Sequence, residues 1–288
     1  MLGTGWLFYR QARLFPQPEI AATVPEAVRL VLSSGRILDL SDCENVDVRE
    51  IEGKVILHNG QLEYCSDSVK RNSEETNTLI IPKGAFYHLI FSDGTKVWLN
   101  SDSKITYPLV FSGNARKVIL TGEAYFEVIA DTKRPFYVQV GEVKIQVLGT
   151  AFNVSAYRED QQVEVALLRG KVGLDLPGNE YVLAPGEIAT WNKGDGLATL
   201  RKGDVESIVD WKTGRFNFED MPLDKLTVKL ARWYGVQFIF EDETTKEFRF
   251  SGAVTKYRTL DYVLGMIVKT TKVAFQEKDG KILVRKIE

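Results

Sequence analysis

The sequence is poor in histidine and cysteine, and this scarcity restricts the chemistry open to it. Its 288 residues include only two of each. His58 and His88 are therefore the only candidates for an imidazole base, and neither lies in a nucleophile motif such as Gly-x-Ser-x-Gly. No glycine-rich phosphate loop follows an expected strand and opens a helix. We therefore expect neither an enzyme nor a cofactor.

The two cysteines, Cys43 and Cys65, allow one disulfide and no disulfide framework. Together with His58 and His88 they could nominally form a four-ligand metal site. Their spacing, however, contains no CxxC or HxxxH pair of the kind that metal sites favour. Buried or free thiols are the favoured interpretation, and a disulfide between neighbouring strands stays open if the compartment is oxidising.

Neither an excess of positive charge nor a complete membrane span is present. The 37 basic and 39 acidic residues give a net charge of −2, so we expect no nucleic-acid partner. Residues 2–9 are apolar, but a spanning helix needs about 20 such residues and a signal peptide needs a basic region before its apolar core. This segment is either a loose end or the tail of a spanning helix whose upstream part is missing.

Carboxylates offer the nearest approach to catalytic chemistry. Glu123 and Glu127 are four apart on an expected strand, share one face, and could pair as acid and base. Exposed strand faces carry charge freely, so solvated carboxylates are the favoured interpretation. Asp93 and Asp102 could bind a cation, but Asp93 already fits a turn position before Gly94.

Strand patterns dominate from about residue 27 to about residue 205. Apolar residues alternate along short runs, and Asn59-Gly60 between two such runs is typical of a tight hairpin. No helical period is sustained in this region, which argues against an α/β fold. We expect a mainly β N-terminal domain, either a sandwich or a solenoid-like stack of antiparallel strands.

A weak internal repetition places glycine between apolar strands. Gly122, Gly149 and Gly170 each follow one apolar run and precede another, where a bulge or corner requires a residue without Cβ. Residues 192–204 are polar and contain three glycines. That stretch predicts the domain boundary.

The pattern changes after residue 205. Asp220 and Pro222 open a helix that carries a stripe of leucines, with Arg232 near its negative end and Gly235 as its C-terminal cap. Thr259 is expected to cap a second helix. With the flanking strands, the order is β-α-β-β-α-β-β, which is a small α+β domain.

The aromatic residues of the β region could build a sugar-binding platform, but their alternation with aliphatic residues favours core packing. They are Trp98, Tyr107, Tyr125, Phe126, Phe136 and Phe152. Trp211, Trp233 and Tyr234 lie beside the expected boundary, where they could join the two domains or contact a partner. Joining is favoured, since Trp233 continues the apolar stripe of the first helix.

A linked set of motifs resembles the FecR family of periplasmic sigma-factor regulators. In the β region these motifs are Asn77-Thr78-Leu79-Ile80-Ile81-Pro82-Lys83-Gly84, Asp93-Gly94-Thr95-Lys96-Val97-Trp98-Leu99-Asn100, Tyr107-Pro108, Arg116-Lys117-Val118, Gly122-Glu123-Ala124-Tyr125-Phe126-Glu127-Val128, Pro135-Phe136, Leu148-Gly149-Thr150-Ala151-Phe152-Asn153-Val154 and Leu183-Ala184-Pro185-Gly186. The motifs similar to the extra C-terminal domain of Bacteroidetes members are Trp211-Lys212, Phe216-Asn217-Phe218, Pro222-Leu223 and Ala231-Arg232-Trp233-Tyr234.

The resemblance implies a transmembrane anti-sigma factor. Such proteins have a cytoplasmic segment that holds an extracytoplasmic-function sigma factor, one spanning helix and a periplasmic β domain. A TonB-dependent outer-membrane receptor signals to them through its own small periplasmic domain. From the resemblance we expect the cytoplasmic segment and most of the spanning helix to be missing from this chain. The chain is therefore expected to be the periplasmic sensor portion, reaching the sigma factor and the inner membrane only through the missing part.

On this basis we expect three parts: a helix remnant and linker (1–26), a FecR-like β domain (27–205) and an α+β signalling-type domain (206–288). The last would receive the receptor's domain, in part at an exposed strand edge that invites strand addition. The expected partner-binding residues are Phe248, Arg249, Phe250, Ser251, Trp211 and Tyr234.

Two alternatives remain open. A soluble β-rich carbohydrate-binding protein would use exposed aromatic side chains. An enzyme would use Glu123 and Glu127 and would lose its turnover when either is changed to glutamine.

Overall fold

The computed structural model describes residues 27–40, 45–50, 53–58, 61–65 and 75–287. Cys43, the Asn59-Gly60 dipeptide and residues 2–9 lie outside these ranges, so the disulfide, the hairpin dipeptide and the helix remnant stay predictions. None of the helices within these ranges is long and apolar enough to cross a membrane.

The first part of the described chain is a β-sandwich whose two sheets share one long strand. Sheet A runs in the order β2 (Ile37–Asp39), β1 (Arg29–Val31), β6 (Thr76–Ile81), β9 (Ser103–Pro108), β10 (Arg116–Glu127), β11 (Phe136–Val140), β12 (Val143–Val147), β15 (Val172–Leu176) and β16 (Asn179–Leu183). Sheet B runs β3 (Asn45–Glu50), β4 (Gly53–His58), β5 (Gln61–Cys65), β7 (Tyr87–Ile90), β8 (Lys96–Leu99), β10, β13 (Ala151–Ala156), β14 (Gln162–Arg169), β17 (Glu187–Asn192) and β18 (Ala198–Lys202).

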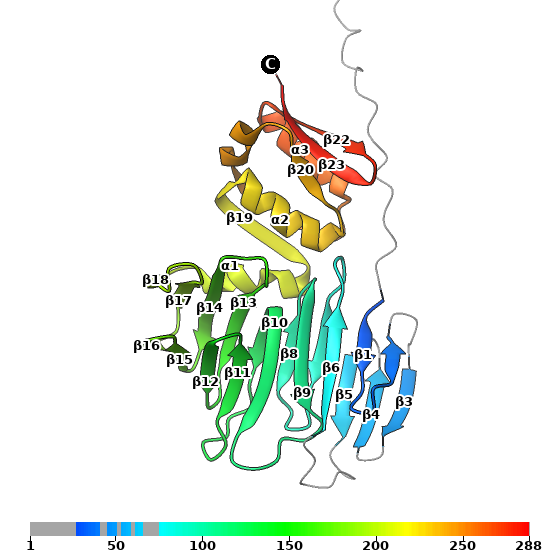
Figure 1. The fold of residues 1–288 in the computed structure, drawn as a ribbon, viewed down its shortest axis with the longest axis vertical. Helices are drawn as coiled ribbons and strands as arrows, with labels where there is room; N and C mark the ends of the chain where they lie inside the picture. Colours follow the sequence, from blue (N-terminus) through cyan, green and yellow to red (C-terminus); the bar gives the residue numbers. More distant parts are fainter. Residues whose placement is uncertain (1–26, 41–44, 51–52, 59–60, 66–74, 288) are drawn as a thin grey trace, which may run out of the picture.

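Successive hairpins after β10 alternate between the two sheets: β11–β12 in A, β13–β14 in B, β15–β16 in A and β17–β18 in B (Figure 1). This winding combines the sandwich and the stack that the sequence predicted. The pairing is antiparallel except between β10 and β11 and between β5 and β7, which are parallel. The stretch 192–204, predicted as the domain boundary, contains a strand, because β18 pairs with β17.

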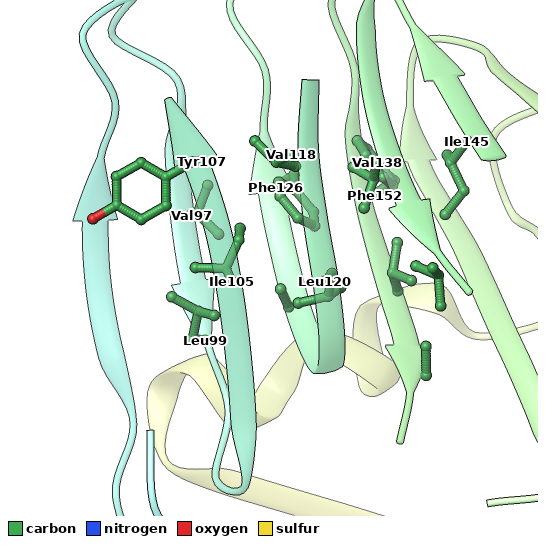
Figure 2. Close-up of a cluster of buried hydrophobic side chains, with 14 of the residues drawn as sticks. Val97, Leu99, Ile105, Tyr107, Val118, Leu120, Phe126, Val138, Ile145 and Phe152 are labelled. Carbon is green, nitrogen blue, oxygen red and sulfur yellow. The ribbon is translucent and has the colours of Figure 1, made fainter. Parts of the chain in front are cut away.

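Alternating side chains from both sheets fill the space between them (Figure 2). Phe126 and Phe152, from neighbouring strands of sheet B, stack with ring centroids 5.1 Å apart. Four of the aromatic residues expected in the core are fully or almost fully buried: Tyr107, Phe126, Phe136 and Phe152. Tyr125 is buried as well, but it belongs to a separate cluster on the opposite face of sheet B.

Gly122 is the point at which β10 passes from sheet A to sheet B. Residues 116–121 of the strand pair with β11 and β9, and residues 122–127 pair with β13 and β8. The φ angle of Gly122 is +99°, and a Cβ there would lie 2.6 Å from the Cα of Ser103. Gly170, between β14 and β15, has φ +96°, and its Cβ would lie 2.8 Å from the carbonyl oxygen of Gly149. The corner positions predicted from sequence are thus confirmed.

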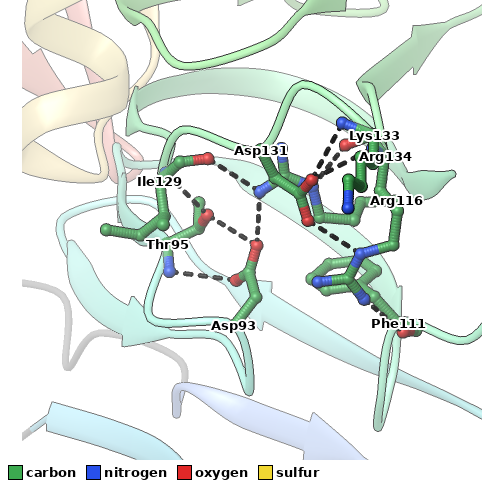
Figure 3. Close-up of polar contacts among 8 residues, drawn as sticks. All are labelled: Asp93, Thr95, Phe111, Arg116, Ile129, Asp131, Lys133 and Arg134. Atoms are coloured by element: carbon green, nitrogen blue, oxygen red, sulfur yellow. Dashed lines mark hydrogen bonds and ion pairs between the residues drawn. The ribbon is translucent and has the colours of Figure 1, made fainter.

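A buried ion pair fixes the start of β10 to the β7–β8 turn (Figure 3). Arg116 Nη1 donates to Asp93 Oδ2 at 2.8 Å, with 1% and 9% of the two side chains exposed. The same guanidinium donates to the carbonyl oxygens of Ile129 and Arg134 at 2.9 and 3.0 Å. Asp93 also accepts from the backbone nitrogen and hydroxyl of Thr95. Asp93 is therefore the turn residue that was predicted, and its carboxylate is occupied by Arg116 rather than by a cation.

The second part is a small α+β module, and its element order confirms the predicted β-α-β-β-α-β-β. Its elements are β19 (Arg215–Pro222), α2 (Leu223–Tyr234), β20 (Phe238–Phe240), η2 (Glu243–Glu247), β21 (Arg249–Thr255), α3 (Leu260–Thr270), β22 (Val273–Lys278) and β23 (Lys281–Lys286). Strands β19 and β21 form one sheet, and β20, β23 and β22 form another. Helix α2 begins after Pro222 and ends at Gly235, whose φ is +69°. Thr259 caps α3 by accepting from the backbone nitrogen of Tyr262.

Replacing Gly122 with alanine should destabilise the sandwich, because the new Cβ meets Ser103 and the backbone remains left-handed. We expect the free energy of unfolding to fall by roughly 2–4 kcal/mol in chemical denaturation. Gly178→Ala is the matched control: its φ is +85° but nothing lies within 4 Å of the added Cβ. It should cost only about 1 kcal/mol. Equal losses in the two variants would show that Gly122 is not a tight corner.

Candidate functional site at the joint between the sandwich and the terminal module

A short connector links the two parts and lies across one end of the sandwich (Figure 1). It consists of α1 (Val205–Val209) and the 3-10 turn η1 (Asp210–Thr213). Trp211, in η1, is buried with 6% exposure and packs with Tyr125 and Ala151 from the sandwich, with Trp233 of α2 against the same cluster. This agrees with the interpretation that Trp211 and Trp233 join the two parts. It also means that Trp211 presents no free surface to a partner.

Lys212 reinforces the same contact through charge. Its Nζ lies 3.9 Å from the ring centroid of Tyr125 and 5.4 Å from that of Trp98. It also lies 3.9 Å from a carboxylate oxygen of Glu127, which accepts a hydrogen bond from the Tyr125 hydroxyl. Burial and the neighbouring Glu127 carboxylate raise the pKa of Tyr125. The end of β10 therefore holds the connector through cation–π contacts and an ion pair with Lys212.

The strongest polar contact between the two parts is made by Arg232, in the last turn of α2. Its two terminal nitrogens donate to Asp160 at 2.6 and 3.0 Å, and its guanidinium carbon lies 3.6 Å from the ring centroid of Tyr157. The carbonyl oxygen of Arg232 also accepts from the backbone nitrogen of Gly84 at 2.8 Å. Lys193 Nζ donates to the carbonyl oxygens of Tyr157 and Asp160 and so stabilises the loop that carries Asp160. We call the Arg232–Asp160–Tyr157 group the interdomain latch.

A cleft of about 450 Å³ opens beside the latch between sheet B and the module. Glu123 lines it and accepts from the side-chain nitrogens of Asn100 and Asn153 at 2.8 and 2.9 Å. The expectation of a solvated carboxylate is therefore wrong for Glu123, because Asn153 of β13 and Asn100, the residue directly after β8, supply these amides. Glu123 and Glu127 are held by different partners, so the geometry does not form the acid–base pair of the enzyme alternative.

Glu164 also lines the cleft, facing Lys229 of α2 and lying 3.6 Å from Arg201. Burial raises the pKa of Glu164, although Lys229 and Arg201 act in the opposite direction. The cleft thus places a carboxylate that resists ionisation where the two parts meet.

The residues predicted for partner binding are separated by the fold. Phe250 is buried in the module core, and Arg249 and Ser251 are exposed on β21. Both of these are already bonded to Asp220: Arg249 Nε forms an ion pair at 2.8 Å, and Ser251 Oγ accepts from its backbone nitrogen at 2.9 Å. Phe248 is half-buried against the same core.

Tyr234 follows the latch at the end of α2. Its hydroxyl donates to the carbonyl oxygen of Arg258 at 3.0 Å, and burial raises its pKa to about 12. It packs against the module core rather than against the sandwich.

Arg232 and Asp160 were missed as functional residues. The sequence placed Arg232 near the negative end of a helix, which explains its charge without a distant partner. Asp160 lies 72 residues earlier in a polar turn. The available signal was an arginine flanked by Ala231, Trp233 and Tyr234 in one of the family-like motifs.

Comparison with protein families gives two matches. The model described as "FecR protein" matches residues 77–173, and the model described as "FecR, C-terminal" matches residues 215–284. The first range lies within the sandwich and the second takes in most of the terminal module. No curated protein matches the chain.

Two solved structures are similar to about three quarters of this chain. Both are crystal structures, at 1.65 and 2.50 Å resolution, of a candidate anti-sigma factor from Parabacteroides distasonis ATCC 8503. Each has a TM-score of 0.69 and 27% sequence identity to this chain. The matches cover 73% and 74% of this chain and 99% and 100% of the crystallised chains.

The latch should show a large coupling energy in a double-mutant cycle of Arg232→Gln and Asp160→Asn. Two charge-assisted hydrogen bonds at a largely buried guanidinium predict a coupling of about 1–2 kcal/mol in chemical denaturation. The exposed pair Lys246 and Glu243, three residues apart in η2, is the control and should couple by about 0.3 kcal/mol. Equal coupling in the two cycles would mean that the latch contributes no more than a surface ion pair.

Glu164→Gln should change how stability depends on pH. Because the folded-state pKa of Glu164 is raised from 4.5, its favourable contribution is fully present below the unfolded pKa. It is lost as the pH rises through the folded pKa. The stability of the variant relative to the parent should therefore rise as the pH is raised from about 4.5 towards neutrality. Glu180→Gln, on exposed β16, is the control. A stability difference that stays constant across this range would contradict the assignment.

Proposed function

The chain belongs to the FecR family, and from this premise we propose that it is the periplasmic sensor portion of a membrane-anchored anti-sigma factor. It would relay a signal from a TonB-dependent outer-membrane receptor to an extracytoplasmic-function sigma factor by protein–protein contact.

The observation that carries this proposal is the joint itself. Two parts with separate cores meet through the latch, the Trp211 cluster and the Lys212 contacts, which are polar and aromatic rather than a continuous apolar core. Interfaces of this composition within one chain permit relative movement of the parts. A partner that binds the module could therefore change how the module sits on the sandwich.

The family is regulatory, and the relay needs no catalysis. The carbohydrate alternative loses its main support, because four of the aromatic side chains that would form a sugar platform are buried in the sandwich core. In the proposed relay the module receives the receptor's domain, and the sandwich passes the change toward the membrane, either by altered packing or by exposing a site for proteolysis.

Calorimetric titration with the isolated N-terminal signalling domain of the cognate TonB-dependent receptor tests the central partner. We expect saturable binding with a Kd in the micromolar range, as for other weak signalling contacts. Absence of heat at concentrations well above that range would remove the receptor from the proposal.

The relay has its own test in cells. Lys256 Nζ lies 3.8 Å from the ring centroid of Phe86, so these two side chains join the module to the sandwich. A Phe86→Cys/Lys256→Cys variant, with both native cysteines replaced by serine, should respond to the receptor until a short bismaleimide bridges the two positions. The single-cysteine variants, treated in the same way, are the controls. Normal signalling by the bridged protein would overturn the relay by domain movement.

A further inference from the structure

Strand β20 is an edge strand with a defined inner and outer side. It pairs in parallel with β23, and on that side the carbonyl oxygen of Gln237 accepts from Ile282 while Glu241 donates to Val284. In a parallel ladder, the backbone N–H and C=O groups of every second residue point toward one neighbouring strand, and those of the residues between them point away from it. The backbone groups of Phe238 and Phe240 therefore face away from β23, and the described residues provide no strand on that side.

A groove of about 710 Å³ runs beside this edge, between β20 and α2. Its apolar lining comprises Val228, Ala231, Val236, Phe238 and Phe240. Val228 is 42% exposed although it lies on a helix that otherwise buries its leucines. A free strand edge flanked by a helix and an apolar floor is the arrangement used by domains that bind an extended peptide as an added strand.

The rim of the groove is basic. Its charged residues are Lys83, Lys225, Lys246 and Asp224. Lys246 is paired with Glu243 of η2 at 2.6 Å. Neither Lys83 nor Lys225 forms an ion pair within the described part of the chain, so their charge remains available to a ligand. An acidic occupant complements this rim.

We propose that this groove binds an extended, acidic segment of a partner protein, which adds to the free edge of β20. Alternate side chains of the segment enter the apolar floor, and its carboxylates face Lys83 and Lys225. The site differs from the edge predicted at Phe248 to Ser251, where Arg249 and Ser251 are already bonded to Asp220. The inference rests on the proposed function only in taking the segment from a signalling partner.

A synthetic peptide provides the direct test. A fluorescein-labelled heptapeptide of alternating glutamate and valine should bind the full chain in fluorescence anisotropy. The same peptide with lysine in place of glutamate should bind at least tenfold more weakly. A version N-methylated at alternate residues cannot complete the backbone ladder, so it should also bind at least tenfold more weakly. Equal affinity of the methylated peptide would overturn strand addition.

Variants of the protein locate the site. Lys83→Glu/Lys225→Glu should weaken peptide binding at least tenfold, whereas Lys269→Glu, an exposed lysine on α3, should not change it. Amide exchange followed by NMR should slow at Phe238 and Phe240 on peptide binding and stay unchanged at Ile239, whose backbone already faces β23. Loss of binding in the lysine variant without slowed exchange at Phe238 and Phe240 would show charge attraction alone and overturn the proposal.

Two further outcomes separate this inference from neighbouring ideas. Tighter peptide binding after removal of residues 1–26 would assign the groove to this chain's own segment and overturn the partner assignment. One outcome is that the receptor's signalling domain binds the full chain with the same affinity when the peptide is added and when Lys83→Glu/Lys225→Glu is introduced. In that case the docking surface is wrong and the proposed function stands. If the peptide binds but the signalling domain does not, the docking groove stands and the receptor is removed from the proposed function.

Discussion

The structure depends on a single strand that belongs to two sheets. The first half of β10 is fixed by the Arg116–Asp93 ion pair and completes sheet A. Gly122 then turns the strand, and its second half completes sheet B. Because Glu123, Tyr125 and Glu127 of the same strand lie on the outer face of sheet B, the strand that closes the sandwich also builds the joint. A distortion at Gly122 would reach both.

The joint uses two kinds of contact with different consequences for movement. The cluster around Trp211 fastens the connector to the sandwich by burying aromatic area, which is costly to separate. The latch instead depends on a geometry that either satisfies both hydrogen bonds of Arg232 or leaves a largely buried guanidinium unpaired. In the proposed relay, a movement of the module would therefore break the latch while the connector stays attached to the sandwich.

Local patterns in the sequence predicted the parts of the fold that local physics determines. Gly122 and Gly170 lie where no Cβ fits. Thr259 marks the start of one helix and Gly235 the end of another. The alternation of apolar and polar residues predicted which strand side chains form the core. Contacts between distant residues were not accessible in this way. Arg232 had a sufficient local explanation, and nothing in the sequence near Asp160 distinguishes it from other turn carboxylates. The hydrogen bonds that hold Glu123 come from β13 and from the residue directly after β8, so the periodicity that placed Glu123 on an open face could not reveal them.

Helix α2 connects the proposed docking groove to the latch. Lys225 and Val228 lie on one flank of the helix, and Lys229 and Arg232 lie on the adjacent flank, which faces the cleft. Lys83 belongs to the sandwich, and its neighbour Gly84 donates to the carbonyl oxygen of Arg232. A segment in the groove therefore touches both parts at once. A ligand shifts a conformational equilibrium only by its difference in affinity for the two states. Since the rim is complete only while Lys83 stays beside α2, an occupant bound to both lysines favours the latched state, and one bound to β20 and Lys225 alone leaves the latch free to open.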